Sequence, residues 1–158
     1  MREEIISACL EHQDLAYKGF NSKIIGGTKY EIIGVRMPII QKLAKKVAKF
    51  SLQEYHNEVL DIYYEEVLIE GLAIAHSSLS FVEKIPLIEK YCIKIDNWAI
   101  CDSFVIALKD NSKEYINLII KFLASPNQYT VRFAIVSLLY HFVDEEHIED
   151  TREFNTYF

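Results

Sequence analysis

The sequence predicts an all-α protein arranged as an α-solenoid, a stack of paired helices. Apolar residues recur at helical spacing along most of the chain, and no segment shows the sustained apolar/polar alternation of a half-buried strand. The 158 residues include only 5 glycines and 3 prolines, which favours helices with tight connections over a turn-rich β fold. Helices of about 10–14 residues that are paired through short links are typical of a solenoid.

Length and composition indicate one globular domain covering residues 1–158. Of these residues, 51% are hydrophobic and 25% are charged, a balance typical of a folded chain rather than a disordered one. A chain of this length buries a sizeable core. Residues 144–158 contain six acidic side chains and one arginine, so we predict an acidic tail or an incomplete further repeat there.

Eight helices are predicted, together with the start of a ninth. Pro38 lies in the first turn of one helix, where its missing N–H costs no hydrogen bond. Ser51 and Ser80 stand where N-caps are expected, and Ser51 with Glu54 matches a capping box. The predicted helices cover residues 3–17, 38–49, 52–60, 65–76, 81–91, 97–108, 113–123 and 129–142, and a further helix begins at 144–150.

Residues 18–34 are loosely patterned and hold four of the five glycines. We predict a long loop or two short turns for this segment. The pair Gly26–Gly27 lacks the G-x-G-x-x-G pattern and the G-K-[ST] ending of a phosphate-binding loop, so a flexible connection is the favoured interpretation.

Cysteine usage and the absence of a targeting pattern predict a cytoplasmic protein. Cys9, Cys92 and Cys101 are odd in number and form no C-x-x-C pattern, which indicates a reducing compartment. The N-terminus lacks the basic-then-apolar layout of a signal peptide. The apolar run at residues 133–143 is too short to span a bilayer, so no membrane partner is expected.

Positive charge is concentrated in the first third of an acidic chain. The net charge is −6, yet residues 1–50 contain 9 basic and 5 acidic side chains. The helix that follows Pro38 has an apolar stripe, and on its opposite face it carries a lysine row, with Arg36 just before it. Four like charges on one face repel each other, and a phosphate backbone would relieve that repulsion; a solvated surface face is the alternative. The lysine row consists of Lys42, Lys45, Lys46 and Lys49.

Trp98 and Asp102 are the most informative pair in the sequence. They are four residues apart, so on a helix they share a face, and that face points away from the apolar stripe through Ile100 and Phe104. A large aromatic side chain beside an anion on an open face suits a cationic or sugar-like group. The alternatives are that Trp98 belongs to the core and that Asp102 serves only to satisfy a basic residue.

Arg132 is the only formal charge between Lys121 and Asp144, on an otherwise apolar helix. A half-buried arginine needs a partner. That partner is either an internal carboxylate, such as Asp102 or Asp96, or a phosphate of a ligand.

Other chemistry-bearing residues give weaker signals. Glu66 and Glu70, next to Glu65, could form a carboxylate pair at i, i+4, but a solvated helix edge or ordinary repeat packing is the favoured interpretation. Cys101 is a poor nucleophile, because the neighbouring anion of Asp102 raises the pKa of its thiol. No H-E-x-x-H and no Cys/His zinc spacing occurs, so we expect neither a metal nor a cofactor.

Several pieces of the sequence, in this order, resemble the AlkD-like DNA alkylation repair glycosylases. The most specific part is a W-x-x-x-D element followed by a later helix with R-x-A-[IV]. The resemblance extends over about residues 14–146. The pieces are residues 34–38 (GVRMP) leading into 41–46 (QKLAKK), 65–71 (EEVLIEG), 95–104 (IDNWAICDSF) and 131–136 (VRFAIV).

This resemblance implies a HEAT-like α-solenoid, stacked as a right-handed superhelix, whose concave basic face grips duplex DNA. It implies an enzyme that removes positively charged N3- and N7-alkylated purines without flipping the base. By the same resemblance Asp102 is the catalytic carboxylate, Trp98 packs on the deoxyribose and Arg132 lies beside the lesion. The chain ends at Phe158, where the family continues through further repeats, so a truncated or short member is expected.

The chemistry implied by the resemblance is physically consistent with these residues. An alkylated purine already carries a positive charge and leaves without a general acid, and a fixed carboxylate stabilises the oxocarbenium-like sugar that remains. Two other functions stay open: a non-catalytic HEAT-like DNA-binding module, and a protein–protein scaffold whose lysine row meets an acidic partner. An uncapped C-terminal repeat would also favour a homo-oligomer.

Overall fold

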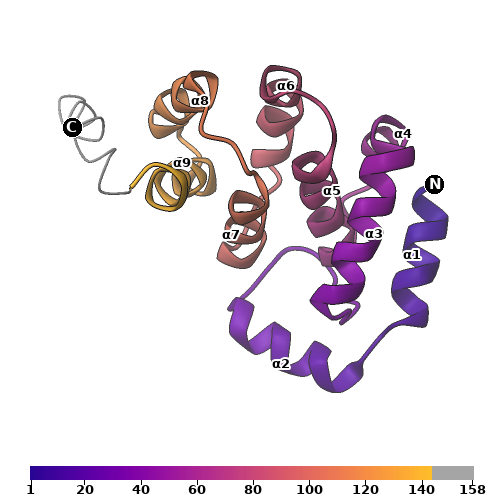
Figure 1. Cartoon of the computed structure of the whole chain (residues 1–158). Helices are drawn as coiled ribbons and strands as arrows, with labels where there is room; N and C mark the ends of the chain where they lie inside the picture. The colour runs from indigo at the N-terminus through magenta and orange to yellow at the C-terminus, as the bar shows by residue number, and fades with distance from the viewer. Residues whose placement is uncertain (144–158) are drawn as a thin grey trace.

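The computed structural model describes residues 1–143, and over that range the chain is all-helical (Figure 1). The only β feature in this range is an isolated bridge between Glu31 and Tyr63. No helix of residues 1–143 is long and apolar enough to cross a membrane. The predicted acidic tail at 144–158 lies outside the described residues. The helices are α1 (Arg2–Glu11), α2 (Leu15–Ile25), α3 (Met37–Phe50), α4 (Leu52–Glu58), α5 (Tyr64–His76), α6 (Phe81–Cys92), α7 (Trp98–Ala107), α8 (Lys113–Leu123) and α9 (Gln128–His141).

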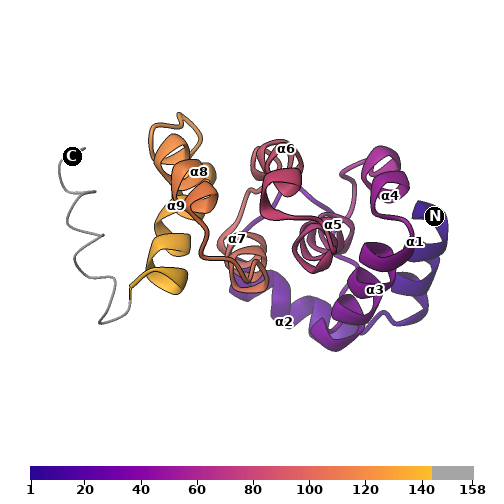
Figure 2. The same ribbon diagram turned by 45° about the horizontal axis from the view of Figure 1, so that its top comes forward.

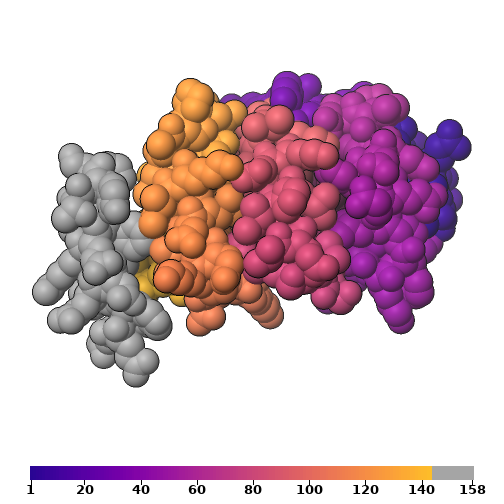
Figure 3. Space-filling model, turned by 90° about the horizontal axis from the view of Figure 1, so that it is seen from above, coloured from indigo at the N-terminus to yellow at the C-terminus, as the bar shows by residue number. Residues whose placement is uncertain are grey.

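The helices from α3 onward pack in two rows that follow the chain. In one row α5 lies between α3 and α7, and α7 in turn packs against α9. The second row contains α4, α6 and α8; α4 and α6 contact α5, α6 reaches α8, and α8 packs on α9 (Figure 2). Successive segments therefore occupy successive bands of the surface (Figure 3).

Helix α5 is the centre of the core. Every residue from Tyr64 to Ala75 is buried, because α1, α3, α4, α6 and α7 all contact this helix. Gly71 permits the closest approach: a Cβ placed there would lie 2.3 Å from the ring of Tyr91. The absence of that Cβ lets the Tyr91 hydroxyl donate to the carbonyl of Val67 at 3.0 Å.

Three glutamates on α5 are buried, so the interpretation of Glu65, Glu66 and Glu70 as a solvated helix edge is wrong. A buried carboxylate without partners would cost several kcal/mol, on the order of the penalty for an isolated ion. Glu65 instead accepts from the backbone N–H groups of Ile33, Gly34 and Val35, at 2.9, 2.7 and 3.2 Å.

The other two carboxylates join distant parts of the chain. Glu66 binds Arg2 and accepts from the N–H groups of Leu60 and Ile62. Burial raises the pKa of Glu66, but these hydrogen bonds outweigh burial, and the pKa lies below its ordinary value. Glu70 accepts from the Lys94 ammonium at 2.9 Å and is 2.7 Å from Nδ1 of His56. All three side chains therefore serve packing between the helices.

The N-terminal part of the chain differs from the sequence prediction. The predicted helix at 3–17 is two helices, and residues 18–25, predicted as loop, belong to α2. Asp14 caps α2 by accepting from the N–H of Tyr17 at 2.9 Å, and Gly26, with φ of 76°, ends it in the left-handed conformation. Ile25 is the only buried residue of α2, so this helix has no apolar stripe from which it could be predicted.

Both predicted serines stand at helix N-caps, but only Ser80 caps its helix with its side chain, and the capping box predicted for Ser51 and Glu54 does not form. Ser80 and Glu83 form a reciprocal capping box at the start of α6, and Pro38 lies in the first turn of α3 as predicted. Ser51 makes no side-chain cap to α4. Its backbone N–H instead closes the last turn of α3 on the carbonyl of Val47 at 2.9 Å, because α3 and α4 follow each other without a linker.

Candidate nucleic-acid interface

Asp102 on α7 and Arg132 on α9 form a bidentate ion pair. Nε of Arg132 donates to Oδ1 of Asp102 at 3.0 Å, and Nη2 donates to Oδ2 at 2.7 Å. The partner of Arg132 is thus Asp102, not Asp96. The pair is open to solvent, with 26% of the Asp102 side chain and 40% of the Arg132 side chain exposed. Packing of α7 against α9 brings the two residues together.

The geometry of this pair leaves Asp102 able to do more than hold Arg132. A carboxylate oxygen accepts two hydrogen bonds, so each oxygen retains a free lone pair after the guanidinium is bound. The hydrogen bond from Arg132 to Asp102 raises the pKa of Arg132, which keeps the guanidinium charged. The result is an oriented carboxylate at the protein surface.

Trp98 lies one helical turn before Asp102 and is 42% exposed, so it does not belong to the core. Asn97 caps α7 by accepting from the N–H of Ile100 at 3.1 Å, which fixes the first turn of the helix. The indole Nε1 donates to the carbonyl of Ile24, at the end of α2, at 3.4 Å. One edge of the ring is thereby held by α2.

Asp96 has a role that the sequence did not indicate. Its carboxylate accepts from the hydroxyl of Thr28 at 2.8 Å, from the N–H of Lys29 at 2.6 Å and from the amide of Asn97 at 2.8 Å. The segment after α2 is therefore fastened to the start of α7, beside Trp98. No local sequence signal identifies this contact, because Thr28 and Asp96 are far apart in the chain.

An open hollow lies between the segments that precede α7 and α9. Its volume is about 560 Å³, and its lining includes Lys29, Asp96, Gln128 and Tyr129. Tyr129 is three residues before Arg132 on α9, so both residues lie on one face of that helix. The hollow thus lies between Asp96, two residues before Trp98, and the start of α9.

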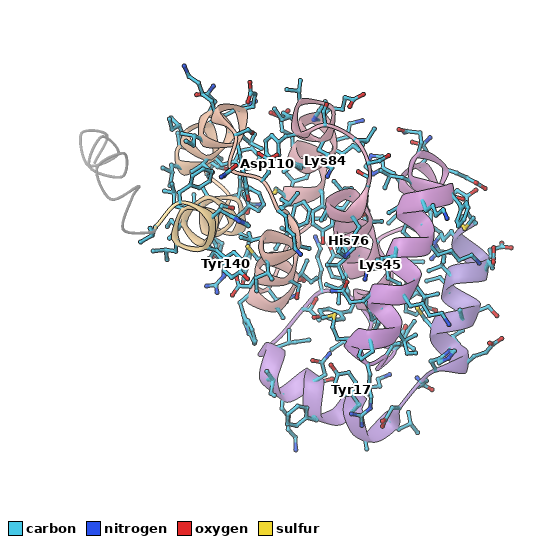
Figure 4. All side chains as sticks on the ribbon, viewed as in Figure 1. Tyr17, Lys45, His76, Lys84, Asp110 and Tyr140 are labelled. Carbon is cyan, nitrogen blue, oxygen red and sulfur yellow. The ribbon has the colours of Figure 1, made fainter. Side chains whose placement is uncertain are left out.

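The lysine row lies on the exposed face of α3, opposite the buried Ile40, Ala44 and Val47. Lys46 pairs with Glu4. Within residues 1–143 no acidic side chain forms an ion pair with the other three members of the row. Arg36, just before α3, binds Asp14 at 2.8 Å and stacks over the ring of Tyr17 (Figure 4).

The structure does not bring the lysine row into contact with Asp102. Helix α5 lies between α3 and α7. Figure 4 shows Lys45 on α3 next to His76, at the end of α5, while Tyr140 lies on α9. The site thus has two separate parts: the cluster of Trp98, Asp102 and Arg132, and the lysine row two helices away.

Cys101, next to Asp102, is not a nucleophile. Burial, followed by the charge of Asp102, raises the pKa of its thiol to about 12, as the sequence predicted in direction. Cys9, Cys92 and Cys101 are all buried and unpaired in the described part of the chain. No group of three or more His, Cys, Asp or Glu residues that could hold a metal ion occurs among residues 1–143.

Taken together, these features define an all-helical protein with one strongly basic helix face and an oriented carboxylate beside an exposed indole. A row of lysines on one helix face can bind the phosphates of a nucleic-acid backbone. A comparison with family models gives a match over residues 10–156 to the family described as DNA alkylation repair enzyme. The chain belongs to this family, and DNA is the partner that the family indicates. Searches of curated proteins and of solved structures returned no match.

Proposed function

We propose that this protein is a DNA glycosylase that hydrolyses the N-glycosidic bond of positively charged N3- and N7-alkylated purines in duplex DNA. One observation carries the proposal: the Asp102 carboxylate is open to solvent, is oriented by two hydrogen bonds from Arg132, and lies one turn from the exposed indole of Trp98. The family match supports DNA repair as the process.

The proposed reaction needs only a fixed negative charge. The alkylated base carries a positive charge and departs with the bonding electrons, so the deoxyribose becomes an oxocarbenium-like cation. The free lone pairs of Asp102 stabilise this cation and orient the water that attacks it. The water adds to the sugar carbon and releases its proton to the solvent.

Trp98 is proposed to shape the sugar site. An aromatic face contributes about 0.5–2 kcal/mol of attraction to a nearby cation, and more as water is excluded. Both Trp98 and Asp102 lie on an open helix face rather than in an enclosed pocket. This placement supports catalysis on a base that stays in the duplex, because base flipping needs a pocket that receives the base.

We propose a HEAT-like solenoid that binds the DNA backbone with Arg36 and the lysine row. The two rows of helices support the solenoid, and its right-handed stacking rests on the family resemblance. From α3 to α7 there are two interhelix steps of about 8–10 Å, so the row and Asp102 are roughly 16–20 Å apart. At about 3.4 Å per base pair this separation corresponds to five or six base pairs. A separation of this size is short enough to be spanned by one duplex.

Replacement of the carboxylate tests the proposal. We expect Asp102→Asn to slow release of 7-methylguanine from methylated duplex by about 10²–10³-fold, the usual effect of removing one electrostatic stabiliser of a transition state. Affinity for the duplex should change little, since the lysine row is intact. The matched control is Glu114→Gln, an exposed acid at the start of α8, which should retain full release. Unchanged release by the Asp102 variant would refute the assignment.

A second function is favoured by one observation: both oxygens of Asp102 already bind Arg132, as in a purely structural pair. The protein would then be a non-catalytic HEAT-like DNA-binding module, which binds duplex but releases no base. A protein–protein scaffold would bind no duplex even at about 50 mM salt, where phosphate contacts are strong. A salt titration and a base-release assay together separate the three functions.

Two further expectations remain predictions. Self-association through an uncapped C-terminal repeat concerns residues outside the described part, and sedimentation at several concentrations tests it. A cytoplasmic location rests on the cysteine pattern of the sequence.

A further inference from the structure

A small basic hollow lies where α3 passes the end of α5. Its volume is about 250 Å³, and it is lined by Lys45, Ala48, Lys49, His76 and Ser78. Figure 4 shows Lys45 and His76 next to each other, from the two helices. Since a water molecule occupies about 30 Å³ in the liquid, the hollow has room for a phosphate group and several waters.

His76 is held in this hollow with a defined tautomer. Its Nε2 lies 2.9 Å from Oε1 of Gln41, and that oxygen can only accept. Nε2 therefore donates. The other ring nitrogen, Nδ1, takes a proton only when the ring becomes a cation.

Positive charge converges on His76 from three elements. Burial, and then the charges of Lys45, Lys109 and Lys84, lower the pKa of His76 below its ordinary value. Lys49 also lines the hollow. Lys84 is fixed by donation to the carbonyl of Ala75 at 3.0 Å.

Few acidic side chains offset the positive charge around His76. The charge of Asp110 acts on Lys84, and its Oδ1 accepts from the N–H of Ser112. In the described part of the chain neither Lys45 nor Lys49 forms an ion pair.

The partial negative charge at the C-terminal ends of helices stabilises only some of these lysines. The ammonium of Lys84, a residue of α6, binds the carbonyl of Ala75 in the last turn of α5, and Lys49 lies in the last turn of α3, so each is stabilised by the negative end of a helix. Lys45 is in the middle of α3 and gains nothing from a helix end. A bound anion would compensate Lys45, Lys49 and a protonated His76 together.

We propose that Lys45, Lys49 and His76 bind one phosphate of the DNA backbone, and that His76 takes up a proton from solvent as the phosphate binds. This inference rests on the proposed function, because it assigns the phosphate to duplex DNA. Lys42 and Lys49 are roughly 10 Å apart along α3 at about 1.5 Å per residue. That length corresponds to about three steps between successive phosphates of one strand, at about 3.4 Å each along the duplex axis. The hollow is therefore continuous with the lysine row rather than an isolated anion site.

The first test follows His76 in the full chain by NMR. Addition of unmodified duplex should raise the pKa of His76 by about one unit, because the phosphate favours the protonated ring. Duplex should then bind several-fold more tightly at pH 5.5 than at pH 7.5, and His76→Gln should remove most of this pH dependence. His12→Gln, a change to an exposed histidine on another face of the chain, is the matched control.

The second test counts phosphate contacts. The double variant Lys45→Gln/Lys49→Gln should reduce the slope of log K against log salt by about two relative to the unmutated chain. The double variant Lys90→Gln/Lys113→Gln, which changes exposed lysines on α6 and α8, should leave the slope unchanged.

The outcomes separate this inference from the proposed function. If duplex binds but leaves the pKa of His76 unmoved, and the Lys45/Lys49 variant behaves like its control, the subsite is overturned while DNA binding stands. A pKa of His76 that rises with inorganic phosphate but not with duplex overturns the assignment to the backbone. If no duplex binds even at low salt, the proposed function fails and the subsite fails with it.

Discussion

At the scale of single residues, the proposed chemistry depends on the orientation of Asp102. Two hydrogen bonds from Arg132 hold the carboxylate in one position although both side chains are partly exposed. An exposed ion pair adds at most about 1 kcal/mol to stability. The bidentate geometry is consistent with the role proposed above for Arg132, which is to position Asp102.

We expect Arg132→Lys to slow release of 7-methylguanine by about tenfold, since a lysine cannot bind both carboxylate oxygens in a planar fork and one charge-assisted hydrogen bond is lost. The charge is conserved, so affinity for duplex should change less than twofold. Single-turnover release and equilibrium binding, measured on the same preparation, separate the two effects. Equal release by the variant and the unmutated chain would mean that the fork does not position Asp102.

The residues of the site differ in how far the sequence could predict them. Trp98 and Asp102 are four residues apart on a helix whose apolar stripe lies on another face, so the sequence predicts that both lie on one open face. In the structure both side chains are partly exposed on that face. The parts played by Glu65 and Asp96 were not predictable. Their partners lie 32 and 68 residues away in the chain, and helical spacing carries no information about such contacts.

At the scale of elements, α3 to α9 were predicted to within two residues at each end. Each of these helices presents an apolar face to a neighbour, and most begin at a capping side chain, as at Ser80, Asn97 and Ser112. Helix α2 was missed because only Ile25 is buried, so its helical signal lies in its caps alone. The end of α2 is held by polar contacts to the start of α7, and its beginning is held by Arg36 and the carbonyl of Gly34, which both bind Asp14.

We expect Asp96→Ala to loosen α2 without unfolding the chain, because it removes the acceptor for Thr28 and Lys29. Amide hydrogen exchange across residues 15–30 should become faster, and base release should fall because Trp98 loses its contact with α2. The control Asp110→Ala removes a similar local cap, to Ser112, at the opposite end of α7. If the amides of residues 15–30 exchange at the same rate in both variants, Asp96 does not anchor α2.

At the scale of the whole molecule, the fold is built around α5. This helix contacts α1, α3, α4, α6 and α7, and its glutamates bind Arg2 near the N-terminus, the segment before α3 and the segment before α7. Its close approach to α6 depends on Gly71, which receives the ring of Tyr91. Apolar packing and buried ion pairs therefore converge on a single element.

Two glycine substitutions test this arrangement. Gly71→Ala should lower the free energy of unfolding by about 1–3 kcal/mol, because the new methyl group would overlap the Tyr91 ring. Gly19→Ala, in α2 with open space around it, should raise it by about 0.4–1 kcal/mol through the reduced entropy of the unfolded chain. Urea unfolding of both variants gives the comparison. A stabilising Gly71→Ala would mean that α5 and α6 can move apart freely.

The burial of α5 from Tyr64 to Ala75 also fixes the distance between the two parts of the site. Because α5 is packed between α3 and α7, neither of these helices can move relative to the other without disrupting the core. The distance between the lysine row and Asp102 is therefore constant. A nuclease footprint on damaged DNA should then show the protected phosphates at the same offset from the lesion, whatever the surrounding base sequence.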